Sequence, residues 1–182
     1  MDIANTVLEL VKYTLPSVVV LASSYLIVKN FLISETKRKQ LALFQDAQNI
    51  TLNLRLQAYE RMALFVERIN PRSLITRVYD PSMTVNELQY AITITIRAEF
   101  EHNLSQQIYV SKNVWETVKN VKEQEIHMAN HIGKSLRPDA PAKELHAMIL
   151  NYVLNSDTES PTEVALQIIK EEVRTLLTYG AM

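Results

Sequence analysis

A long apolar run near the amino end constrains this chain more than any other feature of its sequence. The stretch from Tyr13 to Leu32 contains one charged side chain, Lys29. As a helix rising about 1.5 Å per residue, residues 13–33 extend roughly 31 Å, which matches the hydrocarbon core of a bilayer. Lys12 and Lys29 lie near the two ends, where their long apolar stems let the ammonium groups reach the headgroups. The run therefore predicts a transmembrane helix over residues 13–33.

Two other interpretations of the apolar run remain open. A cleaved secretory signal usually begins with positive charge, but Asp2 and Glu9 accompany Lys12 here, and the apolar run continues beyond residues 22–24. A helix in the core of a soluble domain usually keeps one polar face, whereas residues 18–21 are apolar on every side of a helix. We therefore favour the bilayer.

The basic residues on either side of the run predict its orientation. Lys29, Lys37, Arg38 and Lys39 lie at or beyond its carboxyl end, whereas only Lys12 precedes it. Because basic flanks stay on the cytoplasmic side, we expect the N-terminus outside and the bulk of the chain in the cytoplasm, at the inner (cytoplasmic) membrane. Anionic headgroups would attract the same four side chains, which are therefore candidates for contact with the membrane surface.

The composition favours helices and argues against several classes of function. The chain has only two glycines, too few for a turn-rich β architecture or for a glycine-rich phosphate loop. It has no cysteine, which excludes disulfides and thiolate metal sites. Its 19 basic and 20 acidic residues lack the positive excess of a general nucleic-acid binder. We expect no cofactor, no nucleic-acid partner and no small-molecule substrate.

Helix start signals divide the remainder of the chain. Asn70-Pro71 ends one helix and begins another, and Thr84 has capping-box spacing to Glu87. Isoleucine and threonine alternate over residues 91–96, as in a strand. The preceding cap favours instead a helix that continues to about Ser105. Serines begin two further helices, at Ser111 and Ser160.

The sequence thus predicts an all-α protein in four parts. We expect a short extracytoplasmic N-terminus (residues 1–12), a transmembrane helix (13–33), a long membrane-proximal helix (34–70) and a bundle of about four to five further helices packed on it (71–182).

The membrane-proximal helix has two apolar stripes on nearly opposite sides. A helix in a two-layer bundle needs only one such face. The second stripe is explained either by neighbours within the chain on both sides or by a surface for self-association or a protein partner. The candidate interaction residues are those of this second stripe: Leu52, Leu56, Tyr59, Ala63 and Val66.

Glu99 and His102 are the candidates for metal chemistry. Glu-x-x-His on a helix is the spacing of di-iron bundle sites, and on a helical wheel both side chains fall on the core stripe. The complete motif needs a second copy and two further glutamates, and the chain has no second Glu-x-x-His. We favour a buried ion pair between a glutamate of this motif and an arginine such as Arg55, Arg61 or Arg68.

Two stretches resemble a family of uncharacterised bacterial proteins with one N-terminal span and a helical cytoplasmic region. They are LRLQAYERMALFVERINP (residues 54–71) and EFEHNLSQQIYVS (residues 99–111). The resemblance covers most of the chain and implies membrane attachment and an all-helical fold. It implies no activity and supplies no catalytic residue.

These observations predict a membrane-anchored helical scaffold or interaction module without catalytic activity. It would tether itself or its partners at the cytoplasmic membrane face, with the lipid bilayer and other proteins or a second copy as its partners. The alternative is a metal-binding helical-bundle enzyme that uses Glu99 and His102.

Overall fold

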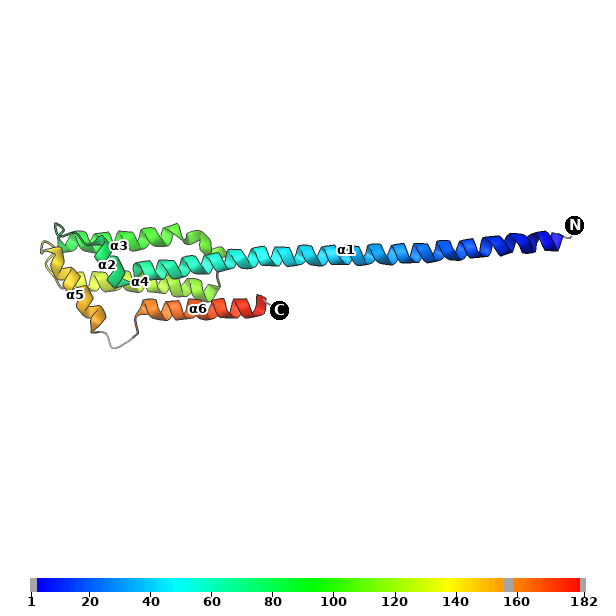
Figure 1. Ribbon diagram of the computed structural model, residues 1–182. Coiled ribbons are helices and arrows are strands. Elements are labelled where there is room, and N and C mark those ends of the chain that lie inside the picture. Colours follow the sequence, from blue (N-terminus) through cyan, green and yellow to red (C-terminus); the bar gives the residue numbers. More distant parts are fainter. Residues whose placement is uncertain (1–2, 156–158, 181–182) are drawn as a thin grey trace. The chain divides into compact units, whose positions relative to one another are not determined.

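The structure, a computed structural model, describes residues 3–155 and 159–180 and confirms the all-α class. In this part of the chain the secondary structure is helical (Figure 1). The elements are α1 (Ile3–Ile69), α2 (Pro71–Val78), α3 (Val85–His102), the 3₁₀ helix η1 (Leu104–Ile108), α4 (Lys112–Lys134), α5 (Ala142–Leu154) and α6 (Pro161–Gly180).

The chain forms two compact units, Met1–Thr51 and Leu52–Met182, and α1 contributes to both. Residues 13–33 and 34–70 both lie within α1, which continues without a break at Ile33. No helix-stop signal lies there, since Ser34 is followed by Glu, Thr and Lys rather than by Gly or Pro. In the first unit, every side chain that the structure describes beyond residue 6 is exposed except the half-buried Glu35.

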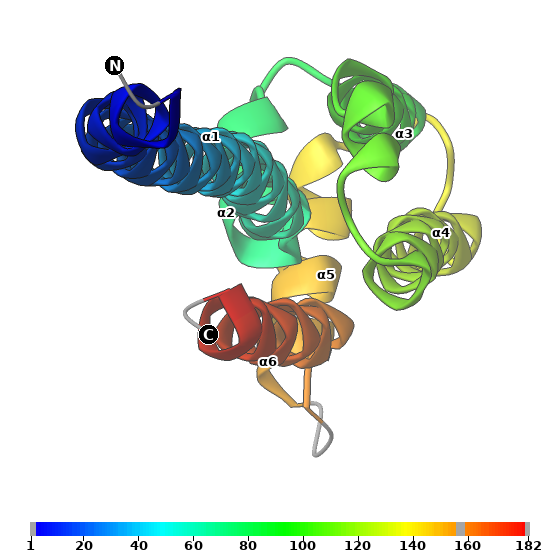
Figure 2. The same cartoon turned by 90° about the vertical axis from the view of Figure 1, so that its right-hand side faces the viewer.

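The second unit is a helical bundle around one apolar core. Figures 1 and 2 show α3, α4 and α6 running alongside one another, with α4 between the other two and α2 and α5 at one end. Each helix buries one stripe, at the three- and four-residue spacing of a helical face. The most deeply buried members include Met62, Phe65 and Ile69 of α1, Leu88 and Ile96 of α3, Val114 and Val118 of α4, Leu145 and Ile149 of α5, and Ala165 of α6.

Three predicted helix starts are confirmed by their hydrogen bonds. The Asn70 side chain accepts from the backbone N–H of Arg72 at 3.1 Å. Thr84 and Glu87 form the complete capping box, in which each side chain accepts from the other residue's backbone N–H. The Ser111 hydroxyl caps α4. Residues 90–97 are helical, and α3 ends at His102 rather than near Ser105, because η1 begins at Leu104.

The second stripe of α1 is divided between core and surface. Tyr59 and Val66 are 2% and 0% exposed, whereas Leu52, Leu56 and Ala63 are half-buried. Tyr59 and Val66 therefore have neighbours within the chain and cannot contact a partner of the folded bundle. For these two residues, packing within the chain accounts for the second stripe, so they are not part of a free interaction surface. For Leu52, Leu56 and Ala63 the interaction surface stays a prediction.

A polar network at Tyr59 joins three helices. The Tyr59 hydroxyl donates to Glu172 Oε2 of α6 at 2.9 Å and accepts from the Ser111 backbone N–H at 3.2 Å. The Ser111 hydroxyl donates to Glu172 Oε1 at 2.7 Å. The Glu172 carboxylate thus lies at the amino end of α4, where the helix dipole favours negative charge. The network fixes how α6 packs against the bundle end of α1.

We expect Tyr59→Phe to lower the free energy of unfolding by about 1.5–3 kcal/mol, because the lost hydrogen bond has a charged acceptor. Guanidinium denaturation of the full-length protein in detergent, followed by circular dichroism, measures this change. The matched control is Tyr90→Phe, since the Tyr90 side chain is 67% exposed. Its effect should stay within about 0.5 kcal/mol, and equal effects from the two variants would contradict the role of the network.

Candidate functional site

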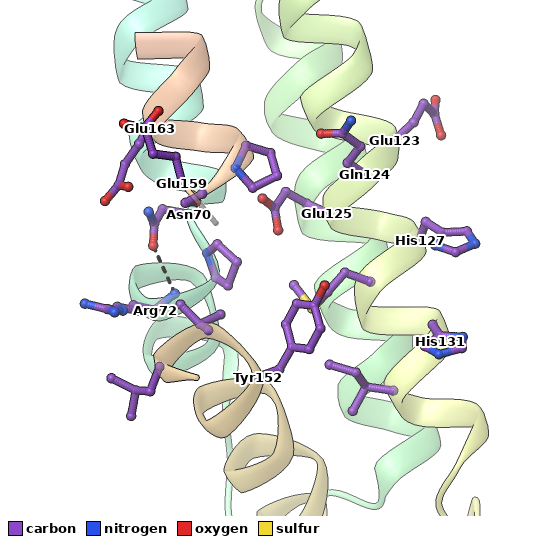
Figure 3. A pocket seen from close by; sticks show the side chains of 17 residues that line it. Asn70, Arg72, Glu123, Gln124, Glu125, His127, His131, Tyr152, Glu159 and Glu163 are labelled. Carbon is purple, nitrogen blue, oxygen red and sulfur yellow. Dashed lines mark hydrogen bonds between the residues drawn. The ribbon is translucent and has the colours of Figure 1, made fainter. Parts of the chain in front are cut away.

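A cleft of about 810 Å³ opens in the second unit beside α2, α4, α5 and the start of α6 (Figure 3). Its volume lies within the range of about 300–1,000 Å³ that is usual for ligand sites. Much of its wall is apolar, contributed by Pro71, Met128, Ile132, Tyr152, Val153, Leu154 and Pro161. The combination of an open mouth and an apolar wall makes it the candidate site of this protein.

Glu125 is the buried ionisable group of this cleft. Its side chain points from α4 into the cleft and is 4% exposed (Figure 3). In the described part of the chain no fully buried side-chain oxygen or nitrogen lacks a hydrogen-bond partner, so the Glu125 carboxylate is not an enclosed, unsatisfied group. Burial in this apolar setting disfavours the ionised form and raises the pKa of Glu125 from 4.5 to about 7. A carboxyl group that titrates near neutral pH inside a cleft is a mark of functional sites.

Glu125 is not among the residues that the sequence singled out, although its spacing from the apolar residues of α4 marks it. Val118, Val121 and Glu125 lie on one face of α4, which continues through Ile132. A carboxylate at a position of an otherwise apolar helix face is unusual, and it can be recognised from the sequence for that reason. The cleft itself has no sequence signal, because its walls come from helices far apart in the chain.

Acidic side chains outnumber basic ones at the cleft. Glu123, Glu159 and Glu163 line it together with Glu125, against the single basic residue Arg72. Glu123 pairs with Lys122 at 2.8 Å. His127 and His131 also line it, but both are exposed and Figure 3 shows them on the outer side of α4. The potential in the cleft therefore favours a cation.

A hydrogen-bonded junction holds the cleft between α2 and α6. The Asn70 side chain donates to the Thr162 hydroxyl at 3.0 Å, while its carbonyl oxygen caps α2. Thr162 is fully buried and also lies 2.7 Å from the Ser160 hydroxyl. Asn70 thus positions the start of α6 beside the start of α2 and fixes one wall of the cleft.

Glu99 and His102 do not come together as a metal site. Glu99 Oε1 lies 3.0 Å from Arg68 Nη2 and 3.9 Å from Arg77 Nη2. Glu99 thus pairs with an arginine, but the pair is not the buried one that we expected, since the Arg68 side chain is 56% exposed. His102 is exposed at the last residue of α3, so its predicted place on the core face is wrong. In residues 3–155 and 159–180, no three His, Cys, Asp or Glu side chains are grouped closely enough for a metal ion.

The four basic residues expected at the membrane surface are exposed in the first unit. The Lys29 ammonium lies 5.9 Å from the centre of the Tyr25 ring, and Lys39 pairs with Glu35 at 3.5 Å. Lys37 and Arg38 are exposed beside them.

Comparison with known proteins identifies a family for this chain but no function. Residues 5–176 match the family of unknown function DUF7935. No curated protein and no solved structure matches the chain. The predicted resemblance to an uncharacterised family is confirmed at this level, and no functional residue follows from it.

The raised pKa of Glu125 makes stability depend on pH in a defined direction. Between pH 4.5 and about 7 the folded protein holds a proton that the unfolded chain releases. The stabilisation is fully present below pH 4.5 and is lost as pH rises through about 7. The total loss is roughly 3 kcal/mol for this shift.

We expect Glu125→Gln to remove this decline, so that the variant is more stable than the wild type at pH 8 and has a flatter profile from pH 5 to 8. Urea denaturation of the full-length protein across this range measures it. The matched control is Glu123→Gln, which changes an exposed glutamate of the same cleft and should keep the wild-type slope. Parallel profiles for wild type and Glu125→Gln would show that the carboxyl group is not desolvated.

Proposed function

This chain belongs to the family of unknown function DUF7935, and we propose that it is a single-span membrane protein whose helical domain binds partner proteins or a second copy. The domain would lie at the cytoplasmic face of the inner membrane. The observation that carries the proposal is the exposure of the described apolar side chains of α1 in the first unit.

The exposure of these side chains supports a lipid environment. The most apolar 18-residue window of α1 is 0% buried. Its exposed side chains surround the helix, as Val19, Val20 and Leu21 illustrate. A core helix has the same composition but would be covered by its own domain. At about 25 cal/mol for each Å² of apolar surface removed from water, lipid contact is strongly favourable for such a helix.

The polar groups of the segment also suit a bilayer. The hydroxyls of Thr14, Ser17 and Ser23 each donate to a backbone carbonyl of the preceding turn at 2.8 Å. In hydrocarbon an unsatisfied hydroxyl is costly, and this bonding to the helix itself removes the cost. Three hydroxyls of residues 13–33 are therefore satisfied without water.

The charge distribution supports the proposed orientation and mode of action. Lys29, Lys37, Arg38 and Lys39 would stay with the cytoplasmic headgroups, opposite Lys12. A domain attached to such a span is confined to the membrane surface, which raises the effective concentration of partners at the same surface. Binding would use the Glu125 cleft, since the second stripe of α1 is largely occupied by the core.

We expect the double variant Val19→Arg, Leu21→Arg to lose membrane integration. Each arginine near the centre of a span costs about 2.5–3.5 kcal/mol of insertion free energy. Wild type should remain in membranes washed with alkaline carbonate, whereas the variant should be extracted. The matched control, Leu41→Arg with Phe44→Arg, changes exposed apolar residues of α1 outside residues 13–33 and should remain integrated. Wild-type protein recovered monodisperse in buffer without detergent would overturn the proposal.

The orientation has its own test, because the chain has no natural cysteine. We expect a single cysteine in Glu9→Cys to react with a membrane-impermeant maleimide added outside intact cells. A cysteine in Asn120→Cys, at an exposed position of α4, should react only after permeabilisation. The reverse pattern would contradict the positive-inside assignment, and labelling of both without permeabilisation would contradict a single span with a cytoplasmic domain.

A further inference from the structure

The buried polar side chains of the bundle differ in how they are satisfied. Asn103, Glu125 and Thr162 are the three buried polar residues in the described part of the chain. Asn103 donates to the Glu99 carbonyl at 2.7 Å, and Thr162 is bonded to Asn70. Glu125 differs from both, because its carboxyl group points into an open cleft (Figure 3). A carboxylate that faces such a cleft among mostly apolar side chains is suited to a cation from outside.

The surroundings of Glu125 define what kind of cation fits. We propose that the Glu125 cleft binds the ammonium group of a lysine side chain presented by a partner protein. This inference rests on the proposed role of the bundle in binding proteins, and it names the chemistry of the partner. An ammonium is a compact point charge that can pair with a single carboxylate, whereas a guanidinium needs several acceptors in a planar fork.

The cleft also accommodates the rest of a lysine side chain. Met128 of α4 and Val153 of α5 provide apolar wall beside Glu125, on which a methylene stem can lie. Tyr152 reaches from α5 into the same opening, where its ring can take a cation on its face (Figure 3). A partner segment with an exposed lysine thus fits better than an anion or a wholly apolar segment.

Proton binding competes with ammonium binding at Glu125. The carboxyl group must be ionised to pair, and its pKa of about 7 leaves it mostly protonated at pH 6. Affinity for an ammonium should therefore rise about tenfold from pH 6 to pH 8. His127 and His131 also line the cleft, so a Gln variant is needed to assign the effect to Glu125. The charged and titratable groups lining the cleft beside it are Arg72 of α2, Glu123, His127 and His131 of α4, Tyr152 of α5, and Glu159 and Glu163 near the start of α6.

The test is calorimetric titration of the full-length protein in detergent with two short, otherwise identical peptides. One contains a single lysine and the other has norleucine, its uncharged analogue, at the same place. We expect saturable binding of the lysine peptide at pH 8, at least about tenfold weaker binding to Glu125→Gln, and no saturation with norleucine. Glu123→Gln, in the same cleft, should bind within about twofold of wild type. A norleucine peptide that binds equally well, or an unchanged affinity in Glu125→Gln, would overturn the inference.

A third probe distinguishes the source of the ammonium. If n-butylamine binds through Glu125 and the lysine peptide does not, the assignment to a protein partner is wrong. Loss of binding in Glu125→Gln is not explained by unfolding, because this variant is expected to gain stability at pH 8. The titration does not depend on membrane insertion. The proposal of a membrane span and the proposal of ammonium binding can therefore be refuted separately.

Discussion

The solvation of the apolar side chains of α1 is the constraint on which the interpretation of this protein depends. From residue 13 to residue 33 the helix has no polar face, and its most apolar window has no cover from the protein itself. Water is a poor solvent for such a surface, whereas the hydrocarbon of a bilayer matches it in both length and chemistry. A lipid environment would also give the basic residues that follow a physical role, because they would anchor the cytoplasmic end. The bundle would then act from a fixed plane rather than from solution.

Hydrogen bonds and ion pairs between distant parts of the chain join the helices of the bundle. Tyr59, Ser111 and Glu172 join three helices, and Asn70 joins the start of α2 to the start of α6 through Thr162. Glu99, with Arg68, pairs α3 with α1. Glu125 differs from these groups, because its carboxyl group is buried among apolar side chains and faces the cleft. Such local inconsistencies tend to mark function rather than packing.

Sequence patterns predicted the features that depend on near neighbours in the chain better than those that depend on residues far apart. The caps at Asn70, Thr84 and Ser111 were predictable, since each depends on hydrogen bonds spanning two or three residues. The cap at Thr84 also favoured helix over strand for residues 90–97, where the alternation of side chains alone suits a strand. Periodicity was misleading for Tyr59 and Val66, because an apolar face on a helix does not reveal whether its neighbour belongs to the same chain. A helical wheel placed His102 on the core face, but His102 is the last residue of α3 and its side chain is exposed.

The sequence by itself determined the all-α class, the apolar run and most helix starts, because these depend on composition and on contacts between near neighbours in the chain. Even Glu125 was visible in principle, as a charge within the apolar stripe of α4. Only the tertiary structure decided that both stripes of α1 have buried members, that Glu99 takes Arg68 as its partner, and that α2, α5 and α6 leave a cleft over Glu125. Those outcomes depend on how helices separated by tens of residues pack, and that packing is set by the sum of many weak contacts rather than by any local pattern.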